Sequence, residues 1–221
     1  MWTRASLSWA SIPPGPRVRC SSCSPCRSVG HSTAQACQRS LHCHLKRYLQ
    51  DNTERALDRS DVPSLKESLC WTFIENQALF ENASLDSLRS YFRERIKATH
   101  EREQPRAHGF VEAPRYIYFL KADQEVLQEL KHTTNNPDLT KAYGLSHIKL
   151  IRADASTLTN DNGSVDEEDA YEAIDGCSDF DVGWMKIALK LTGPSFYESL
   201  YGSNEAWYAY YQRPPDELLS C

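Results

Sequence analysis

The chain has 221 residues, of which 40% are hydrophobic and 10% aromatic, and its net charge is −5. This length allows one domain with appendages or two small domains, and the apolar content is enough for a packed core. No run of about 18 apolar residues occurs, which excludes a membrane-spanning helix.

Residues 1–50 are predicted to be a basic, Ser/Cys-rich tail, because they hold seven Lys/Arg and no acid, whereas residues 51–221 hold eighteen Lys/Arg against thirty Asp/Glu. Few apolar residues are available to offset the ordering entropy, so the first interpretation is a disordered segment. A second is a transit peptide, since positive, serine-rich segments without acids are typical of organelle targeting. A third, minority interpretation is a zinc site with thiolate and imidazole ligands drawn from Cys20, Cys23, Cys26, Cys37, Cys43 and His44.

The irregular spacing of these cysteines lacks the two separated ligand pairs of a zinc finger, so no metal is favoured and no cofactor is expected. Five of the eight cysteines lie in the tail, and no apolar stretch suitable for a secretory signal precedes them. The sequence therefore predicts an intracellular protein, cytoplasmic in the first instance and mitochondrial if residues 1–50 are a transit peptide.

Residues 51–113 are predicted to form a helical pair followed by a linker. Ser64 and Glu67 have the spacing of a capping box, which would start a helix that runs to Phe80. A second helix is expected from Ser84, because Leu85, Leu88, Phe92 and Ile96 recur at helical spacing. Arg89, Arg93 and Lys97 would form a basic stripe on another face of that helix, which we interpret as solvated rather than as a site for an anionic partner.

Residues 114–215 are predicted to form a ferredoxin-like α+β domain, with 216–221 as a short tail. Aromatic and alternating segments indicate strands at 115–120, 146–153, 181–191 and 206–215. Helices are expected at 122–134 and 195–203. This order is the βαββαβ pattern, which predicts a four-stranded antiparallel sheet with two helices on one face.

The second face of this sheet is predicted to carry His147 and Lys149 from one strand and Trp184 and Lys186 from the next. An exposed face of this kind requires cover. We expect the cover to come from the helices of residues 64–100 or from a second copy of the chain, with a protein partner as a further candidate. Residues 114–215 hold nine Lys/Arg and sixteen Asp/Glu, a balance that repels phosphate and argues against nucleic acid.

A long acidic loop is predicted between two of the strands, with nine acids from Asp161 to Asp181. We interpret it as a solvated connection. If it binds anything, its charge favours a basic surface.

The sequence contains no nucleophile elbow, P-loop or dinucleotide fingerprint. The leading hypothesis is therefore a non-catalytic interaction or assembly protein. The alternative is a cofactor-independent enzyme of isomerase or cyclase type, or a ligand-binding protein with an accessory biosynthetic role, whose pocket would be lined by Tyr118, His147, Asp181, Trp184 and Tyr210. A zinc-binding adaptor that uses the tail is the third hypothesis.

Overall fold

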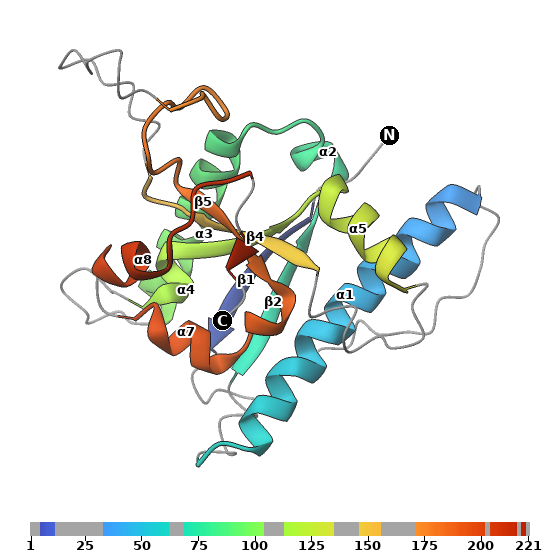
Figure 1. Cartoon of the computed structure of the whole chain (residues 1–221). Coiled ribbons are helices and arrows are strands. Elements are labelled where there is room, and N and C mark those ends of the chain that lie inside the picture. Colours follow the sequence, from blue (N-terminus) through green and yellow to red (C-terminus); the bar gives the residue numbers. More distant parts are fainter. Residues whose placement is uncertain are drawn as a thin grey trace.

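The computed structural model describes residues 5–11, 33–61, 69–103, 113–134, 146–155, 171–201, 204–215 and 218–219. These residues form an α+β arrangement in which one sheet of six strands has helices on both faces (Figure 1). The strands are β1 (Ala5–Ser11), β2 (Leu69–Glu75), β3 (Tyr118–Ala122), β4 (His147–Arg152), β5 (Trp184–Ala188) and β6 (Leu218–Leu219). The helices are α1 (Thr33–Asp58), α2 (Gln77–Phe80), α3 (Leu85–Glu103), α4 (Pro114–Ile117), α5 (Gln124–Thr134), η3 (Leu189–Leu191), α7 (Pro194–Ser199) and α8 (Asn204–Tyr210).

The strand order is β2-β1-β3-β4-β5-β6, and all neighbours are antiparallel except β5 and β6, which are parallel. The ferredoxin-like order is not confirmed. It would separate the strands at 118–122 and 147–152, but here these two strands pair directly, with Lys121 opposite Lys149. Because β3 pairs with β4 and β4 with β5, both antiparallel and in chain order, these three strands form a meander.

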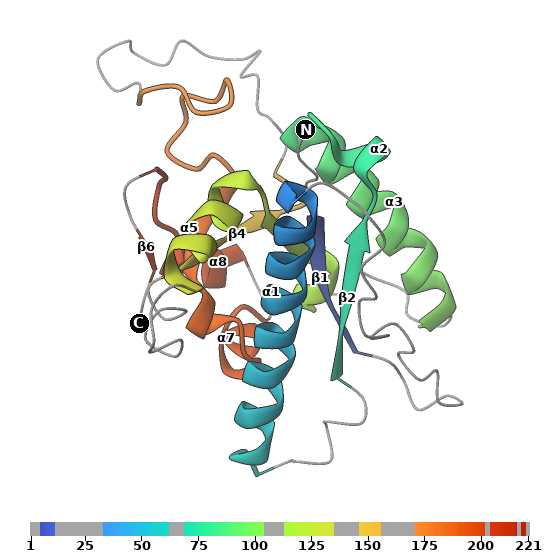
Figure 2. The same ribbon diagram turned by 90° about the vertical axis from the view of Figure 1, so that its right-hand side faces the viewer.

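The predicted boundary of the tail at residue 50 is not observed, because α1 runs through it from Thr33 to Asp58. Leu41, Leu45 and Leu49 recur every fourth residue along this helix and are all buried, which accounts for its docking onto the sheet. Figure 2 shows α1 lying along β1 and β2. The rest of the predicted tail, residues 1–4 and 12–32, lies outside the described residues.

The predicted helix that ends at Phe80 is wrong for residues 69–75, which form β2 and pair along their whole length with β1. The segment is dense in apolar residues, so its pattern fits a helix or a strand, and the partner strand in the presumed tail decides the outcome. Only α2 is helical here, and the proposed capping box at Ser64 lies outside the described residues. The second helix is confirmed as α3, where Ser84 Oγ accepts a hydrogen bond from the backbone N–H of Ser87 at 3.1 Å.

The predicted strand at 206–215 is also wrong, because α8 occupies residues 204–210. Its aromatic residues recur at helical rather than alternating positions, and Trp207 and Tyr211, four residues apart, both face the core. The remaining elements follow the predicted order, with strand 115–120 displaced to β3 because Pro114 begins the short helix α4.

Two hydrophobic clusters lie on opposite faces of the sheet. On one face α1, α5, α7 and α8 pack on residues such as Leu120, Leu150 and Ile187. On the other face α2 and α3 pack on Phe119, Ile151 and Trp184, with the Phe92 and Phe119 rings stacked at 4.8 Å. The helices of residues 77–103 thus cover part of the predicted aromatic face. None of the helices in the described ranges is both long and apolar enough to cross a membrane.

Candidate functional site

The five residues of the predicted pocket are divided between the two faces of the sheet. Trp184 and His147 share one face, as expected from the alternation of β4 and β5. Tyr118 lies on the opposite face, where its ring stacks on that of Trp207 at 5.5 Å. Asp181 accepts a hydrogen bond from Trp207 Nε1 at 3.1 Å, and Tyr210 packs edge-on against Phe196 at 5.5 Å.

Neither of two hollows in the described part of the chain corresponds to the predicted pocket. A cavity beside Tyr118 has a volume of only about 10 Å³, which is too small for a ligand. A cleft of about 210 Å³ lies between the start of α3 and the 174–177 turn, with Lys121 and Cys177 in its wall. It contains none of the five predicted residues.

A row of three lysines crosses the face that carries Trp184, which we call the lysine face. Lys121 of β3 lies directly opposite Lys149 of β4, and Lys149 lies directly opposite Lys186 of β5. Their side chains are only 11%, 12% and 16% exposed. Like charges in opposed positions are destabilising in a sheet, so this row requires nearby acids.

The acids come from the first turns of α5 and the residue before it. Asp123 Oδ2 lies 2.9 Å from Lys149 Nζ and 3.5 Å from Lys121 Nζ. Glu125 bridges the other pair, with Oε2 at 2.6 Å from Lys149 Nζ and Oε1 at 3.0 Å from Lys186 Nζ. His147, at the start of β4, contacts Glu129 through Nδ1 and lies 3.7 Å from Glu125 Oε1 through Nε2.

The charges of this network reinforce each other. Burial by itself would raise the pKa of Asp123 and Glu125, but the lysines outweigh it and hold both values below the ordinary range. Burial likewise disfavours the Lys149 ammonium, yet its hydrogen bonds to Glu125 and Asp123 raise its pKa above the usual value. All three groups are therefore charged at neutral pH.

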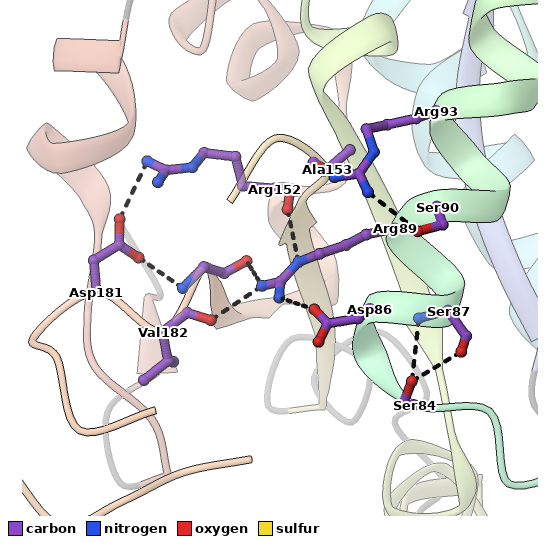
Figure 3. Close-up of polar contacts among 11 residues, drawn as sticks. Ser84, Asp86, Ser87, Arg89, Ser90, Arg93, Arg152, Ala153, Asp181 and Val182 are labelled. Atoms are coloured by element: carbon purple, nitrogen blue, oxygen red, sulfur yellow. Dashed lines mark hydrogen bonds and ion pairs between the residues drawn. The ribbon is translucent and has the colours of Figure 1, made fainter. Parts of the chain in front are cut away.

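Arg89 corrects the interpretation of the basic stripe on α3, because its guanidinium is buried rather than solvated. Figure 3 shows it between α3 and the chain that enters β5. Its Nε donates to the carbonyl of Arg152 at 3.1 Å, and Nη2 donates to those of Val182 and Gly183 at 3.1 and 3.2 Å. Nη1 pairs with Asp86 at 3.1 Å. Arg89 is thus a structural clamp, whereas Arg93 and Lys97 are exposed as predicted.

Residues 171–182 form a small structure that we call the acidic hairpin. Ile174 and Cys177 bridge across the turn at Asp175 and Gly176. Two side chains from the C-terminal segment fasten it. Tyr211 Oη accepts from the Val182 N–H at 3.0 Å and donates to the Phe180 carbonyl at 2.9 Å, and Arg213 Nη2 donates to the Glu172 carbonyl at 2.7 Å.

A continuous series of ring contacts runs from the core to this hairpin. Trp207, which stacks on Tyr118, also contacts the ring of Tyr211 at 5.4 Å. Tyr211 then contacts Phe180 at 5.3 Å, and Phe180 contacts Tyr171 at 5.7 Å. The last two side chains are 50% and 49% exposed. The exposed rings are therefore held in place by buried ones.

Asp181 and Arg152 join the hairpin to the sheet. Arg152 Nη1 lies 3.1 Å from Asp181 Oδ2, and the other carboxylate oxygen of Asp181 accepts from the Gly183 N–H at 2.8 Å. Burial would lower the pKa of Arg152, but its hydrogen bond to Tyr208 and the nearby carboxylates raise it. Asp181 is therefore occupied by structural contacts.

The candidate zinc ligands are not brought together within the described residues. Cys43 and His44 are exposed on α1, and Cys37 belongs to the first turns of the same helix. Cys20, Cys23 and Cys26 lie outside the described residues. Where the structure describes side chains, no group of three or more His, Cys, Asp or Glu could hold a metal ion.

The lysine face and the acidic hairpin are each completed by residues that were not predicted. Lys121 follows the predicted end of its strand, so its place beside Lys149 could not be derived. Phe180 and Tyr171 lie inside the predicted acidic loop, where two aromatic residues in a segment without Lys or Arg are a signal that the loop is more than a solvated connection. Comparison of the chain with protein-family models, curated proteins and solved structures finds no match.

Proposed function

We propose that this chain is a non-catalytic interaction protein that uses the acidic hairpin to bind a basic segment of a protein partner. The observation that carries the proposal is the series of ring contacts that ends in the half-exposed Phe180 and Tyr171. Rings that are already fixed lose little conformational entropy on binding, and aromatic residues are enriched among the residues that dominate interface energies.

The charge of the surface supports a basic partner. No Lys or Arg occurs from residue 156 to residue 182, whereas nine Asp/Glu do. Glu172 and Asp175 of the hairpin are exposed. A Lys/Arg-rich segment could pair with these carboxylates while its cations lie over the exposed rings.

The alternative enzymatic hypothesis has less support. Tyr118, His147, Asp181, Trp184 and Tyr210 do not line one cavity within the described residues. His147 and Asp181, the two expected polar groups, lie in separate networks of ion pairs.

A peptide-binding measurement on the full chain tests the proposal. Fluorescence anisotropy with a short labelled Lys/Arg-rich peptide should show binding that weakens with added salt, and a Glu-rich peptide should not bind. The double variant Tyr171→Ala, Phe180→Ala keeps every charge of the hairpin and should weaken binding by about tenfold or more.

Tyr201→Ala is the matched control, because Tyr201 is 63% exposed but belongs to the segment between α7 and α8 and not to the hairpin. It should bind the basic peptide as the unmodified chain does. Equal affinity of the double variant and the control would mean that the rings are not used, and preference for the Glu-rich peptide would exclude a basic partner.

A further inference from the structure

Glu125 occupies a position in the lysine face that a separate anion could fill. Lys149 Nζ reaches one of its carboxylate oxygens at 2.6 Å, and Lys186 Nζ reaches the other at 3.0 Å. His147 Nε2 lies 3.7 Å from the same oxygen as Lys186, beyond hydrogen-bond distance. We call His147, Lys149 and Lys186 the basic cradle.

The side chains of the cradle are more buried than the carboxylate that pairs with them. The three cradle side chains are 7–16% exposed and stand on β4 and β5, whereas Glu125 is 48% exposed in the first turn of α5. The basic groups are therefore largely enclosed, whereas Glu125 is half exposed to solvent. Rotation of Glu125 into solvent would uncover the cradle without breaking the sheet.

Two buried nitrogen atoms at the cradle make no hydrogen bond within the described residues. His147 Nε2 and Trp184 Nε1 are both buried and have no hydrogen-bond partner among the described residues, and these two residues are 6% and 8% exposed. Trp184 is also the ring over which Lys149 Nζ lies, at 5.1 Å. Buried polar atoms without partners are uncommon in folded proteins and indicate a bound group or a functional site.

The other charges near the cradle do not remove its preference for an anion. Asp123 remains with Lys121 and Lys149, and Glu129 remains with His147, when Glu125 leaves. Lys186 then has no acid within ion-pair distance among the described residues. Three opposed lysines on neighbouring strands are costly to fold, and such local conflicts are expected where function requires them.

We propose that the basic cradle is a binding site for the carboxylate group of a small molecule, which displaces Glu125. Because the resident group is a carboxylate that accepts one lysine on each oxygen, an incoming carboxylate can reproduce both contacts. The site is separate from the acidic hairpin and does not depend on the peptide-binding proposal.

Acetate is the probe for this site. Addition of acetate to the full chain should shift the NMR signals of the Lys149 and Lys186 side chains. In Glu125→Ala acetate should bind about tenfold or more tightly, because no internal carboxylate competes. Acetate should also raise the melting temperature of this variant, and Lys186→Met in the same background should abolish both effects.

Glu75→Ala is a matched control, because Glu75 also joins a lysine and a histidine, Lys46 at 2.7 Å and His42 at 3.6 Å, but with only one lysine. It should gain no acetate response. The proposal is overturned if Glu125→Ala responds no more than Glu75→Ala, or if the unmodified chain shows no shift at acetate concentrations a hundredfold above those that saturate Glu125→Ala. Stronger binding of inorganic phosphate than of acetate would overturn the carboxylate assignment.

Discussion

The buried guanidinium of Arg89 packs directly against the backbone of Gly183. Arg89 Nη2 donates to the Gly183 carbonyl at 3.2 Å, and a Cβ atom on Gly183 would overlap the same nitrogen and the Cβ of Ala155. Gly183 also has a φ of +71°, a backbone conformation that residues other than glycine rarely adopt. The close approach of the clamp to β5 therefore requires glycine at this position.

Gly183→Ala should lower the free energy of unfolding by about 2–4 kcal/mol, because backbone strain and overpacking add. Urea unfolding at pH 7 measures the loss. Gly176→Ala is the control, since Gly176 has a φ of +84° but no atom within 4 Å of the added Cβ. It should lose only about 1–2 kcal/mol from strain. Equal losses would show that Arg89 can move away at no cost.

Arg89→Met should destabilise the chain by about 3–5 kcal/mol, because it removes the buried guanidinium that donates to three carbonyls. Of these, the Gly183 carbonyl still accepts from the Arg152 N–H at 3.0 Å. The comparison is Arg93→Met on the same helix. Arg93 is exposed and reaches one carbonyl, that of Ala153, at 2.9 Å, so its loss should be about 1 kcal/mol. Chemical denaturation of both variants measures the two losses in the free energy of unfolding. An equally small loss for Arg89→Met would mean that water replaces the guanidinium.

The elements with clear periodicity could be predicted from the sequence, and those that depend on distant partners could not. The helix from Ser84 and the strand at 146–153 have strong local patterns, and the structure contains them as α3 and β4. In α1, Leu41, Leu45 and Leu49 form a buried stripe with helical spacing. These residues lie in a basic segment without acids, and the composition of that segment as a whole led to the prediction of a disordered tail.

In the lysine face, too, the strands could be predicted from the sequence, but the contacts with distant residues could not. The alternation of β4 and β5 places Lys149 and Lys186 on one face, as predicted, because a strand has a fixed period of two. The contact of Glu125 with these lysines depends on the direction that α5 takes after β3. The burial of Arg89 depends on the position of the loop that precedes β5. Both are tertiary relationships that local sequence patterns do not encode.

The pKa of Asp123 should be visible in the acid stability of the chain. Because the nearby lysines lower its pKa in the folded state, its ionised form contributes stability above the ordinary carboxyl pKa of about 4. That contribution is lost as the pH falls further, through the lowered folded value. Asp123→Asn should therefore be less stable than the unmodified chain at pH 7 and lose less between pH 5 and pH 2.

Urea unfolding across this pH range checks the prediction, with Glu94→Gln as the control at an exposed carboxylate of α3. The control should follow the unmodified chain at every pH. Parallel curves for Asp123→Asn and the unmodified chain would instead mean that Asp123 adds nothing to the acid dependence.

Tyr211→Phe should loosen the acidic hairpin, because the hydroxyl both accepts from the Val182 N–H and donates to the Phe180 carbonyl. We expect a loss of about 1–3 kcal/mol at pH 7, measured by urea unfolding. Burial raises the pKa of Tyr211 to about 12, so its contribution is complete below the ordinary tyrosine value of about 10. The unmodified chain should therefore lose stability as the pH rises from about 10 towards 12, and the variant should lose less.

Tyr118→Phe is the matched comparison for this variant. Burial also raises the pKa of Tyr118 to about 12, but within the described residues its contact is the stacked ring of Trp207 rather than a hydrogen bond of its hydroxyl. Its stability at pH 7 should lie within about 0.5 kcal/mol of the unmodified chain. Both variants keep the ring and remove only a hydroxyl. If Tyr118→Phe were as damaging as Tyr211→Phe, the loss would not depend on the two hydrogen bonds of the Tyr211 hydroxyl, and these bonds would not be what fastens the hairpin.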